Sequence, residues 1–171
     1  MKTKPKVHQT AYVDKHAVVY GNVEIGEDSS VWPFASLRCE MNRVVIGKRT
    51  NIQENSVVHT DYTHDTIIGD NVTAGHNAIV HGATVGNNCV IGMGAIVLDG
   101  AVIEDNCFIA AGSVVTPNTR IQKNSMVMGV PGRVVREIKK EEIDFIKKNA
   151  QWYVDPKNKY KKGVFGEYGK N

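Results

Sequence analysis

An aliphatic residue recurs every six positions along most of the chain, and this period constrains the fold more than any other feature of the sequence. The positions are Val13, Val19, Ile25, Val31, Leu37, Ile46, Ile52, Val58, Ile68, Ala74, Val80, Val85, Ile91, Val97, Ile103, Ile109, Val115 and Ile121. A period of six matches neither the 3.6-residue turn of an α-helix nor the two-residue alternation of a half-buried strand. It does match one short strand followed by one turn.

Three such units close one triangular coil, and stacked coils place every eighteenth residue about 4.8 Å above its predecessor. The aliphatic side chains then fill the interior as ladders. Cys89 and Cys107 are eighteen residues apart, so they are expected to be buried corner residues of one column. The sequence therefore predicts an all-β fold, a parallel β-helix domain over residues 1–133.

The interval between aliphatic residues departs from six in three places, which are 37–46, 58–68 and 80–85. Each departure is expected to be a loop or a tightened corner. The longest contains residues 60–66, directly after His59. Loops on a rigid scaffold often carry functional residues, so this loop is a candidate part of a site.

Residues 134–171 have a different pattern. Apolar residues recur at helical spacing from about 141 to 154, and Asp155-Pro156 is expected to end that helix. The apolar stripe is expected to pack on the coil. The basic tail that follows is polar enough to be mobile or to be ordered only by a partner.

The chain has 171 residues, of which 42% are hydrophobic and 23% charged, so we expect a single soluble domain with an appendage. The formal charge of +3 comes from the tail 155–171, which leaves a neutral body and argues against nucleic-acid and membrane partners. No apolar run approaches the roughly 18 to 20 residues of a membrane span, and we expect a cytoplasmic protein. Three scattered cysteines make neither a disulfide framework nor a zinc spacing.

Two histidines fall in one outward column of the predicted coil. Arg38, His59 and His81 each follow an aliphatic residue on the same face of successive coils. Single surface histidines are usually just solvated, but two stacked one coil apart could share a tetrahedral ion with Zn–N distances of about 2.0–2.1 Å. The column therefore predicts a metal site.

His76 lies on the preceding face, one coil above Gln53 and Glu54. It is not expected to reach the other two histidines within its own chain. A neighbouring subunit could supply it, so the pattern predicts a homotrimer with three equivalent interface sites. Three histidines leave a fourth position open, as catalytic rather than structural zinc does.

Four segments resemble the gamma-class carbonic anhydrase family of hexapeptide-repeat proteins. They are Trp32–Arg38, Thr50–Glu54, Thr73–Gly82 and Ile91–Ala95. The repeat itself, with the glycines that often follow its aliphatic residues, resembles the hexapeptide-repeat proteins over about residues 11–133. That resemblance implies that the β-helix is left-handed, although crossovers in sheets are generally right-handed.

The resemblance also implies roles for individual residues. It implies that His59, His76 and His81 are the metal ligands and that Gln53 contacts the metal-bound water or bicarbonate. It implies that Arg38 belongs to an intersubunit ion network. The family usually has aspartate where this chain has Glu40 and Glu54, which keeps the charge and lengthens the reach.

The implied reaction is the reversible hydration of carbon dioxide to bicarbonate by a metal-dependent lyase. The ion would lower the pKa of its water from 15.7 to about 7 and so provide the attacking hydroxide. Zinc suits imidazole ligands, as do iron and cobalt. Two other functions stay open. One is a coenzyme A-dependent acyltransferase, because the segment Val127–Val135 is of a kind that both groups of hexapeptide-repeat proteins share. The other is a metal-loaded scaffold with little activity.

Fast hydration also needs a proton relay, and the best-known family members carry glutamates for it on a long acidic loop. The loop here is short and offers Asp61, His64 and Asp65. Only His64 has an unperturbed pKa near 6.5, which makes it the candidate catalytic relay, although a solvated histidine without a role fits equally well. We therefore expect weak or condition-dependent hydration.

Overall fold

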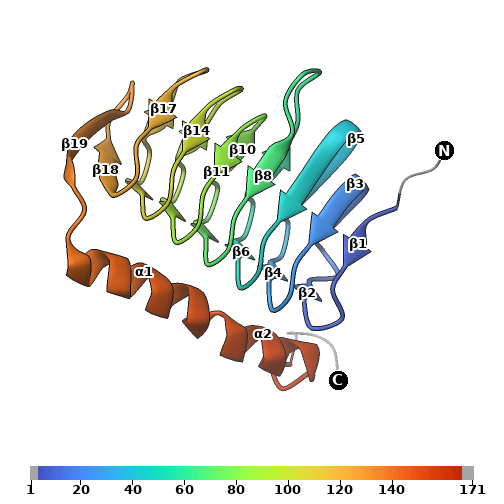
Figure 1. Ribbon diagram of the computed structural model, residues 1–171. Helices are drawn as coiled ribbons and strands as arrows, with labels where there is room; N and C mark the ends of the chain where they lie inside the picture. Colours follow the sequence, from blue (N-terminus) through green and yellow to red (C-terminus); the bar gives the residue numbers. More distant parts are fainter. Residues whose placement is uncertain (1–3, 167–171) are drawn as a thin grey trace.

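The computed structural model describes residues 4–166 and forms a left-handed parallel β-helix with two helices along one side (Figure 1). The eight-stranded sheet on one face contains β2 (Tyr12–Val13), β4 (Ser30–Val31), β6 (Asn51–Ile52), β9 (Thr73–Ala74), β12 (Val90–Ile91), β15 (Phe108–Ile109), β18 (Ser125–Met128) and β19 (Arg133–Glu137). All of its pairs are parallel except β18 with β19. The fold class predicted from the six-residue period is confirmed.

An eleven-stranded sheet forms the other two faces. Its strands are β1 (Lys6–Val7), β3 (Val18–Ile25), β5 (Ser36–Ile46), β7 (Val57–His59), β8 (Thr66–Ile68), β10 (Ile79–His81), β11 (Thr84–Val85), β13 (Ile96–Val97), β14 (Val102–Ile103), β16 (Val114–Val115) and β17 (Arg120–Ile121). The two faces count as one sheet because β5 pairs with β7 through its first residues and with β8 through its last.

The interior is a set of aliphatic ladders, as the period predicts. Val31 pairs in register with Ile52, Ile52 with Ala74, and Ala74 with Ile91, and each is at most 1% exposed. Burying each valine or isoleucine side chain contributes about 1.5–3 kcal/mol, so the ladders hold the coils together. Cys89 and Cys107 are buried as predicted, with the Cys107 amide donating to Cys89 Sγ at 3.4 Å.

Asparagine builds one corner of the coil. Asn71, Asn88, Asn106 and Asn124 all have φ between +53° and +62°, a region that asparagine tolerates better than most residues. Their side-chain amides form a ladder, with N···O distances of 3.1, 3.2 and 3.0 Å between successive coils. The corner is therefore stabilised by hydrogen bonds outside the apolar core.

Residues 37–46 do not form the expected loop or tightened corner. They belong to the continuous strand β5, which passes through the corner beside β3. The close approach of the two strands requires glycine at position 21, because a Cβ there would lie 1.7 Å from the Cys39 carbonyl oxygen. The interval 58–68 does contain a loop, and the interval 80–85 turns at Gly82, where φ is +56°.

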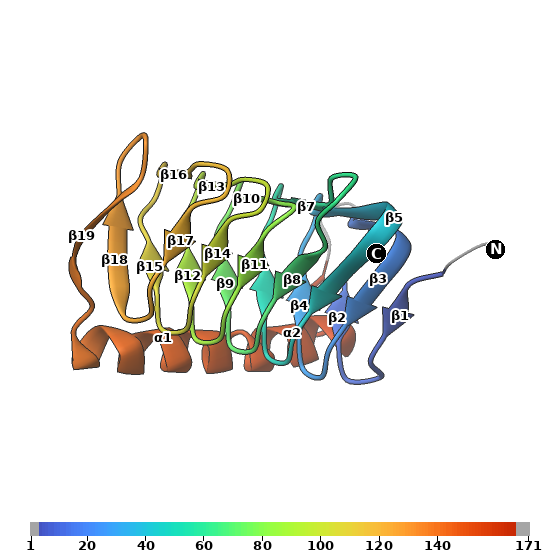
Figure 2. The same ribbon diagram turned by 45° about the horizontal axis from the view of Figure 1, so that its top comes forward.

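Helix α1 (Lys140–Trp152) packs on the eight-stranded face, with Ile146 and Ala150 buried. The expectation that the helical pattern ends at Asp155-Pro156 is wrong, because α2 (Val154–Lys161) follows directly (Figure 2). Pro156 is compatible with α2 because it lies in the first turn, where its missing N–H leaves no hydrogen bond unmade. None of the helices in residues 4–166 is long and apolar enough to cross a membrane.

The first part of the basic tail forms α2, which ends at Lys161 and contacts the first coils. Lys157 is fully buried, and its Nζ donates to the Thr10 carbonyl at 2.7 Å, to Asp28 Oδ1 at 2.8 Å and to Asn158 Oδ1 at 2.9 Å. Its partners on the first coils could not be identified from helical spacing. The last part of the predicted tail, 167–171, lies outside the described residues.

Candidate metal centre

His59 and His81 lie at the ends of β7 and β10, directly opposite each other in parallel register. His59 Nδ1 and His81 Nε2 are 3.0 Å apart, and the ring centroids are 5.0 Å apart. Arg38 is the neighbour of His59 on the other side, on β5. The structure thus brings together the column that counting repeat units predicts.

Each of the three predicted ligand histidines has a carboxylate at one ring nitrogen. Glu40 Oε2 lies 3.2 Å from His59 Nε2, and Asp99 Oδ1 makes a short contact with His81 Nδ1. Glu54 Oε2 lies 2.7 Å from His76 Nδ1. A carboxylate at one nitrogen of an imidazole fixes its tautomer and leaves a lone pair on the other nitrogen, as in many metal sites.

The two facing nitrogens lie within hydrogen-bonding distance, at 3.0 Å, and their donor and acceptor roles depend on the tautomers of the rings. With the protons of both rings on the nitrogens that face the carboxylates, both facing nitrogens are acceptors, and a cation between them would satisfy both lone pairs. A proton is disfavoured on His59, because burial, then the charges of Arg38 and His81, lower the pKa of its imidazole. Two nitrogens on one tetrahedral zinc ion lie roughly 3.3 Å apart, so His59 and His81 fit two adjacent ligand positions.

His76 follows β9 at a different corner and is half-exposed. Its backbone N–H donates to Gln53 Oε1 at 3.2 Å, which ties it to the coil below. Among residues 4–166, no group of three or more histidine, cysteine, aspartate or glutamate side chains could hold a metal ion. One chain therefore assembles two of the three predicted ligands and holds the third elsewhere.

Gln53 is buried between the coil and α1, and all its polar atoms have partners. Its Nε2 donates to Asn51 Oδ1 at 3.0 Å and to the Tyr153 hydroxyl at 2.7 Å. Burial, then the charge of Glu54, raise the pKa of Tyr153, so its hydroxyl stays protonated at neutral pH. Helical spacing did not place Tyr153 here, because it does not set the position of α1 along the β-helix.

A cleft of about 390 Å³ opens beside His59 and His81. Its walls are formed by Arg38, Glu40, Met41, His59, Thr60, Asp61, Tyr62 and His81. Arg38 and Glu40 make a short ion pair within the chain, while Glu54 pairs with His76. The predicted members of the ion network are thus divided between the two histidine faces.

His64 does not line this cleft. Its Nδ1 lies 2.8 Å from Asp61 Oδ2, and its backbone N–H donates to the other carboxylate oxygen. Burial opposes ionisation of Asp61, but the hydrogen bonds from His64 and Thr63 outweigh it and hold the pKa of Asp61 well below its usual range. The His64 ring is thereby held beside Gly100, outside the walls of the cleft.

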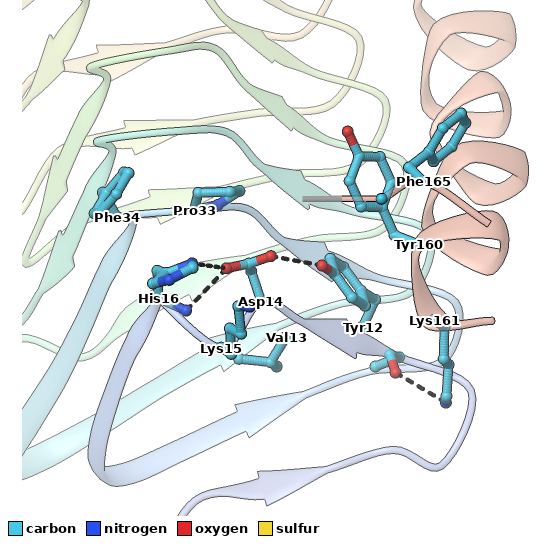
Figure 3. A pocket seen from close by; sticks show the side chains of 12 residues that line it. Tyr12, Val13, Asp14, Lys15, His16, Pro33, Phe34, Tyr160, Lys161 and Phe165 are labelled. Carbon is cyan, nitrogen blue, oxygen red and sulfur yellow. Dashed lines mark hydrogen bonds and ion pairs between the residues drawn. The ribbon is translucent and has the colours of Figure 1, made fainter. Parts of the chain in front are cut away.

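A larger cavity of about 800 Å³ lies between the first coils and the end of α2 (Figure 3). Asp14 forms part of its floor, accepting hydrogen bonds from the Tyr12 hydroxyl at 2.6 Å and the His16 amide at 2.8 Å. His16 also lines the cavity, and its ring stacks on Phe34. None of the three predicted ligand histidines lines it, so cavity size does not locate the candidate metal centre.

Comparison with known proteins finds hexapeptide-repeat proteins, and relatives that are named carbonic anhydrases. The family model "Bacterial transferase hexapeptide (six repeats)" matches residues 65–99 and 82–117. A Methanocaldococcus jannaschii protein named "Probable carbonic anhydrase" is 53% identical over 86% of this chain and 93% of that relative. "Gamma carbonic anhydrase 1, mitochondrial" of Arabidopsis thaliana is 46% identical over 87% of this chain and 56% of that relative.

Solved structures share the fold. The structure of a hexapeptide transferase family protein from Anaplasma phagocytophilum superposes with a TM-score of 0.89 at 39% identity. The match covers 92% of this chain and 93% of that one. The fold is therefore shared by proteins with different names.

Proposed function

Because the chain belongs to the gamma-class carbonic anhydrase family of hexapeptide-repeat proteins, we propose that it catalyses the reversible hydration of carbon dioxide to bicarbonate. The proposed site is a metal ion held by His59, His81 and His76 of the partner subunit. The observation that carries this proposal is the pair of nitrogens on His59 and His81, 3.0 Å apart, each with its other ring nitrogen at a carboxylate.

The ion, when bound, supplies a Lewis acid that lowers the pKa of water, and imidazole ligands suit zinc, iron and cobalt. The chain's own residues do the rest. The cleft beside His59 has room for a small substrate, and the ion pair of Arg38 with Glu40 lies in its wall. The Nε2 of Gln53 is held by Asn51 and Tyr153, so the group proposed to orient a polar ligand is its Oε1, which accepts the His76 N–H and has a second lone pair.

A homotrimer follows from the division of the ligands between two faces of the coil. The His59/His81 face of one subunit would meet the face that carries Gln53 and Glu54 in the next, and threefold closure repeats the site three times. Glu40 and Glu54 each bind one of the histidines within the chain, so both faces are ordered before they meet. Assembly then completes the ligand set without rearranging either face.

The test compares wild-type protein with His81→Ala, both purified anaerobically. The wild type is expected to hold about one metal ion per subunit and to hydrate carbon dioxide, while His81→Ala loses both, because the two imidazoles left at each site cannot hold the ion tightly. Elemental analysis and stopped-flow hydration measure the two quantities. His8→Ala changes a histidine that binds Thr10 on the first coil, and it should match the wild type. Equal metal content in His81→Ala and the wild type would contradict the proposal.

An acyltransferase that uses coenzyme A is the second candidate, supported by the likeness to the hexapeptide transferase structure. Such an enzyme needs one histidine as general base and a cleft for the pantetheine arm. It has no need of two stacked imidazoles whose outer nitrogens both face carboxylates. The arrangement of His59 and His81 therefore favours the hydration of carbon dioxide.

A further inference from the structure

The carboxylate of Asp99 is placed to hold one histidine of the candidate metal centre in a single orientation. We propose that Asp99 is a positioning residue: by accepting the Nδ1–H of His81, it keeps the Nε2 lone pair of that ring aimed at the metal ion. This inference rests on the proposed function, because it assigns His81 as a metal ligand. Asp99 itself touches neither the ion nor the substrate.

The coil is built to bring this carboxylate to the imidazole. Strand β13 pairs in register with β10, so the residues after β13 lie over His81 and Gly82. Gly100 confirms that stacking, since its N–H donates to the Gly82 carbonyl at 2.7 Å. A Cβ at Gly82 would lie 2.6 Å from Asp99 Oδ1, so the glycine after His81 leaves the space that the carboxylate occupies.

Other aspartates between coils serve the backbone, whereas Asp99 does not. Asp70 accepts the Lys48 amide and Asp105 accepts the Asn87 amide, each at 2.7 Å. In the described part of the chain, the side-chain partner that the structure gives Asp99 is His81 alone. A carboxylate with only this partner contributes little to joining the coils, and its contact is to the imidazole.

Without the Asp99 carboxylate, the His81 ring would no longer be held in one tautomer. A neutral imidazole then carries its proton on either nitrogen, and only the form protonated on Nδ1 offers Nε2 to a metal ion. Removing such an outer partner typically weakens metal affinity about 10–100-fold. The backbone of the coil is expected to stay intact.

The experiment uses the full chain with Asp99→Ala, Asp99→Asn and the matched control Asp105→Ala. Zinc affinity is measured by competition with a chelator. The tautomer of His81 is measured in the metal-free protein by long-range ¹H–¹⁵N NMR of the imidazole nitrogens. The second measurement needs no bound metal and no activity, so it reports on orientation alone.

Asp99→Ala is expected to weaken zinc binding about 10–100-fold and to shift the His81 ring signals towards mixed tautomers. Asp99→Asn keeps an oxygen that accepts the Nδ1–H, so it should restore the tautomer and part of the affinity. If Asp99→Ala does not fold, a mixture of His81 tautomers in the metal-free wild type overturns the proposal. Asp105→Ala should change neither readout.

Zinc affinity within twofold of the wild type in Asp99→Ala, with an unchanged His81 tautomer, would overturn the positioning role. The proposed function would survive that result if His81→Ala still abolished zinc binding. If His81→Ala also bound zinc normally, the metal centre itself would be wrong. The two failures are thus separate outcomes of one titration series.

Discussion

Gln53 is an example of a single side chain fixed by its surroundings. It is 4% exposed, and it joins Asn51 on the coil, Tyr153 between α1 and α2, and the backbone of His76. Satisfying every polar atom of a buried amide avoids a cost of about 1–3 kcal/mol per unpaired group. The amide therefore has one orientation, which is what a ligand-orienting residue requires.

Tyr153→Phe tests that role at the residue scale. The change removes one hydrogen bond from Gln53 Nε2 but leaves its bond to Asn51. A hydrogen bond of this kind is worth about 1 kcal/mol, so kcat/KM for hydration should fall about fivefold while metal content stays the same. Tyr160→Phe, on α2, is the control and should match the wild type. An unchanged kcat/KM in Tyr153→Phe would show that the tyrosine does not help to orient Gln53.

The period of six placed His59, His81 and Arg38 in one column because the register of the coil is regular. It could not assign the partners of their rings. Asp99 lies eighteen residues beyond His81 and is recoverable from the repeat in hindsight, but an aspartate at a corner more often serves the backbone. Tyr153 carried no such signal, because a hundred residues of chain separate it from Gln53.

At the scale of elements, the start of α1 depends on one charged cluster. Glu142 Oε2 accepts the Lys139 amide at 2.8 Å, and both carboxylate oxygens bind Arg136 at 2.7 Å. The hydrogen bonds from Arg136 and then Lys139 lower the pKa of Glu142 to about 2. The carboxylate thus fixes the first turn of α1 to the end of β19.

This shift gives α1 a defined pH dependence. The pKa of Glu142 is lower in the folded state, so its contribution to stability is complete above its ordinary pKa of 4.5 and is lost as pH falls towards 2. Glu142→Gln should therefore lower the melting temperature near neutral pH and flatten its decline between these limits. Thermal unfolding followed at several pH values measures both effects.

Glu141→Gln, on the same turn, is the matched control for the pH series. It removes one negative charge from the first turn of α1 and keeps the contacts of Glu142 with Arg136 and Lys139. Its pH profile should follow the wild type. If the melting temperatures of Glu142→Gln and the wild type fell equally steeply with pH below 4.5, the cluster of Arg136, Lys139 and Glu142 would not hold α1.

Elements that obey the repeat were predictable, and those that depend on distant contacts were not. The ladders followed from spacing alone, since each aliphatic residue has one possible neighbour above and below. Strand β5 was not predicted, because its pairing with β3 through the corner needs Gly21 rather than an aliphatic residue. Helix α2 was not predicted, because it is anchored by Lys157 rather than by an apolar stripe. A lysine in the sequence gives no sign that it will be buried against Thr10 and Asp28 on the first coils.

At the scale of the whole molecule, the division of the histidines is the central feature. His59 and His81 lie on one face of the coil, and His76 lies at another corner. The proposed function requires that His76 of the partner subunit complete the metal centre. A chain alone is then expected to bind metal weakly, and the complete site is expected only in the assembly.

Mixing two inactive variants tests this claim most directly. His76→Ala and His81→Ala homotrimers each lack one ligand at every interface, so neither is expected to bind zinc tightly. When the subunits are unfolded together, refolded at equal amounts and titrated with zinc, about one interface in four combines intact His59/His81 with an intact His76. About a quarter of the wild-type zinc capacity is therefore expected to return. If mixing restores no zinc binding although mixed trimers form, the three histidines do not meet across subunits, and the proposed metal centre is wrong.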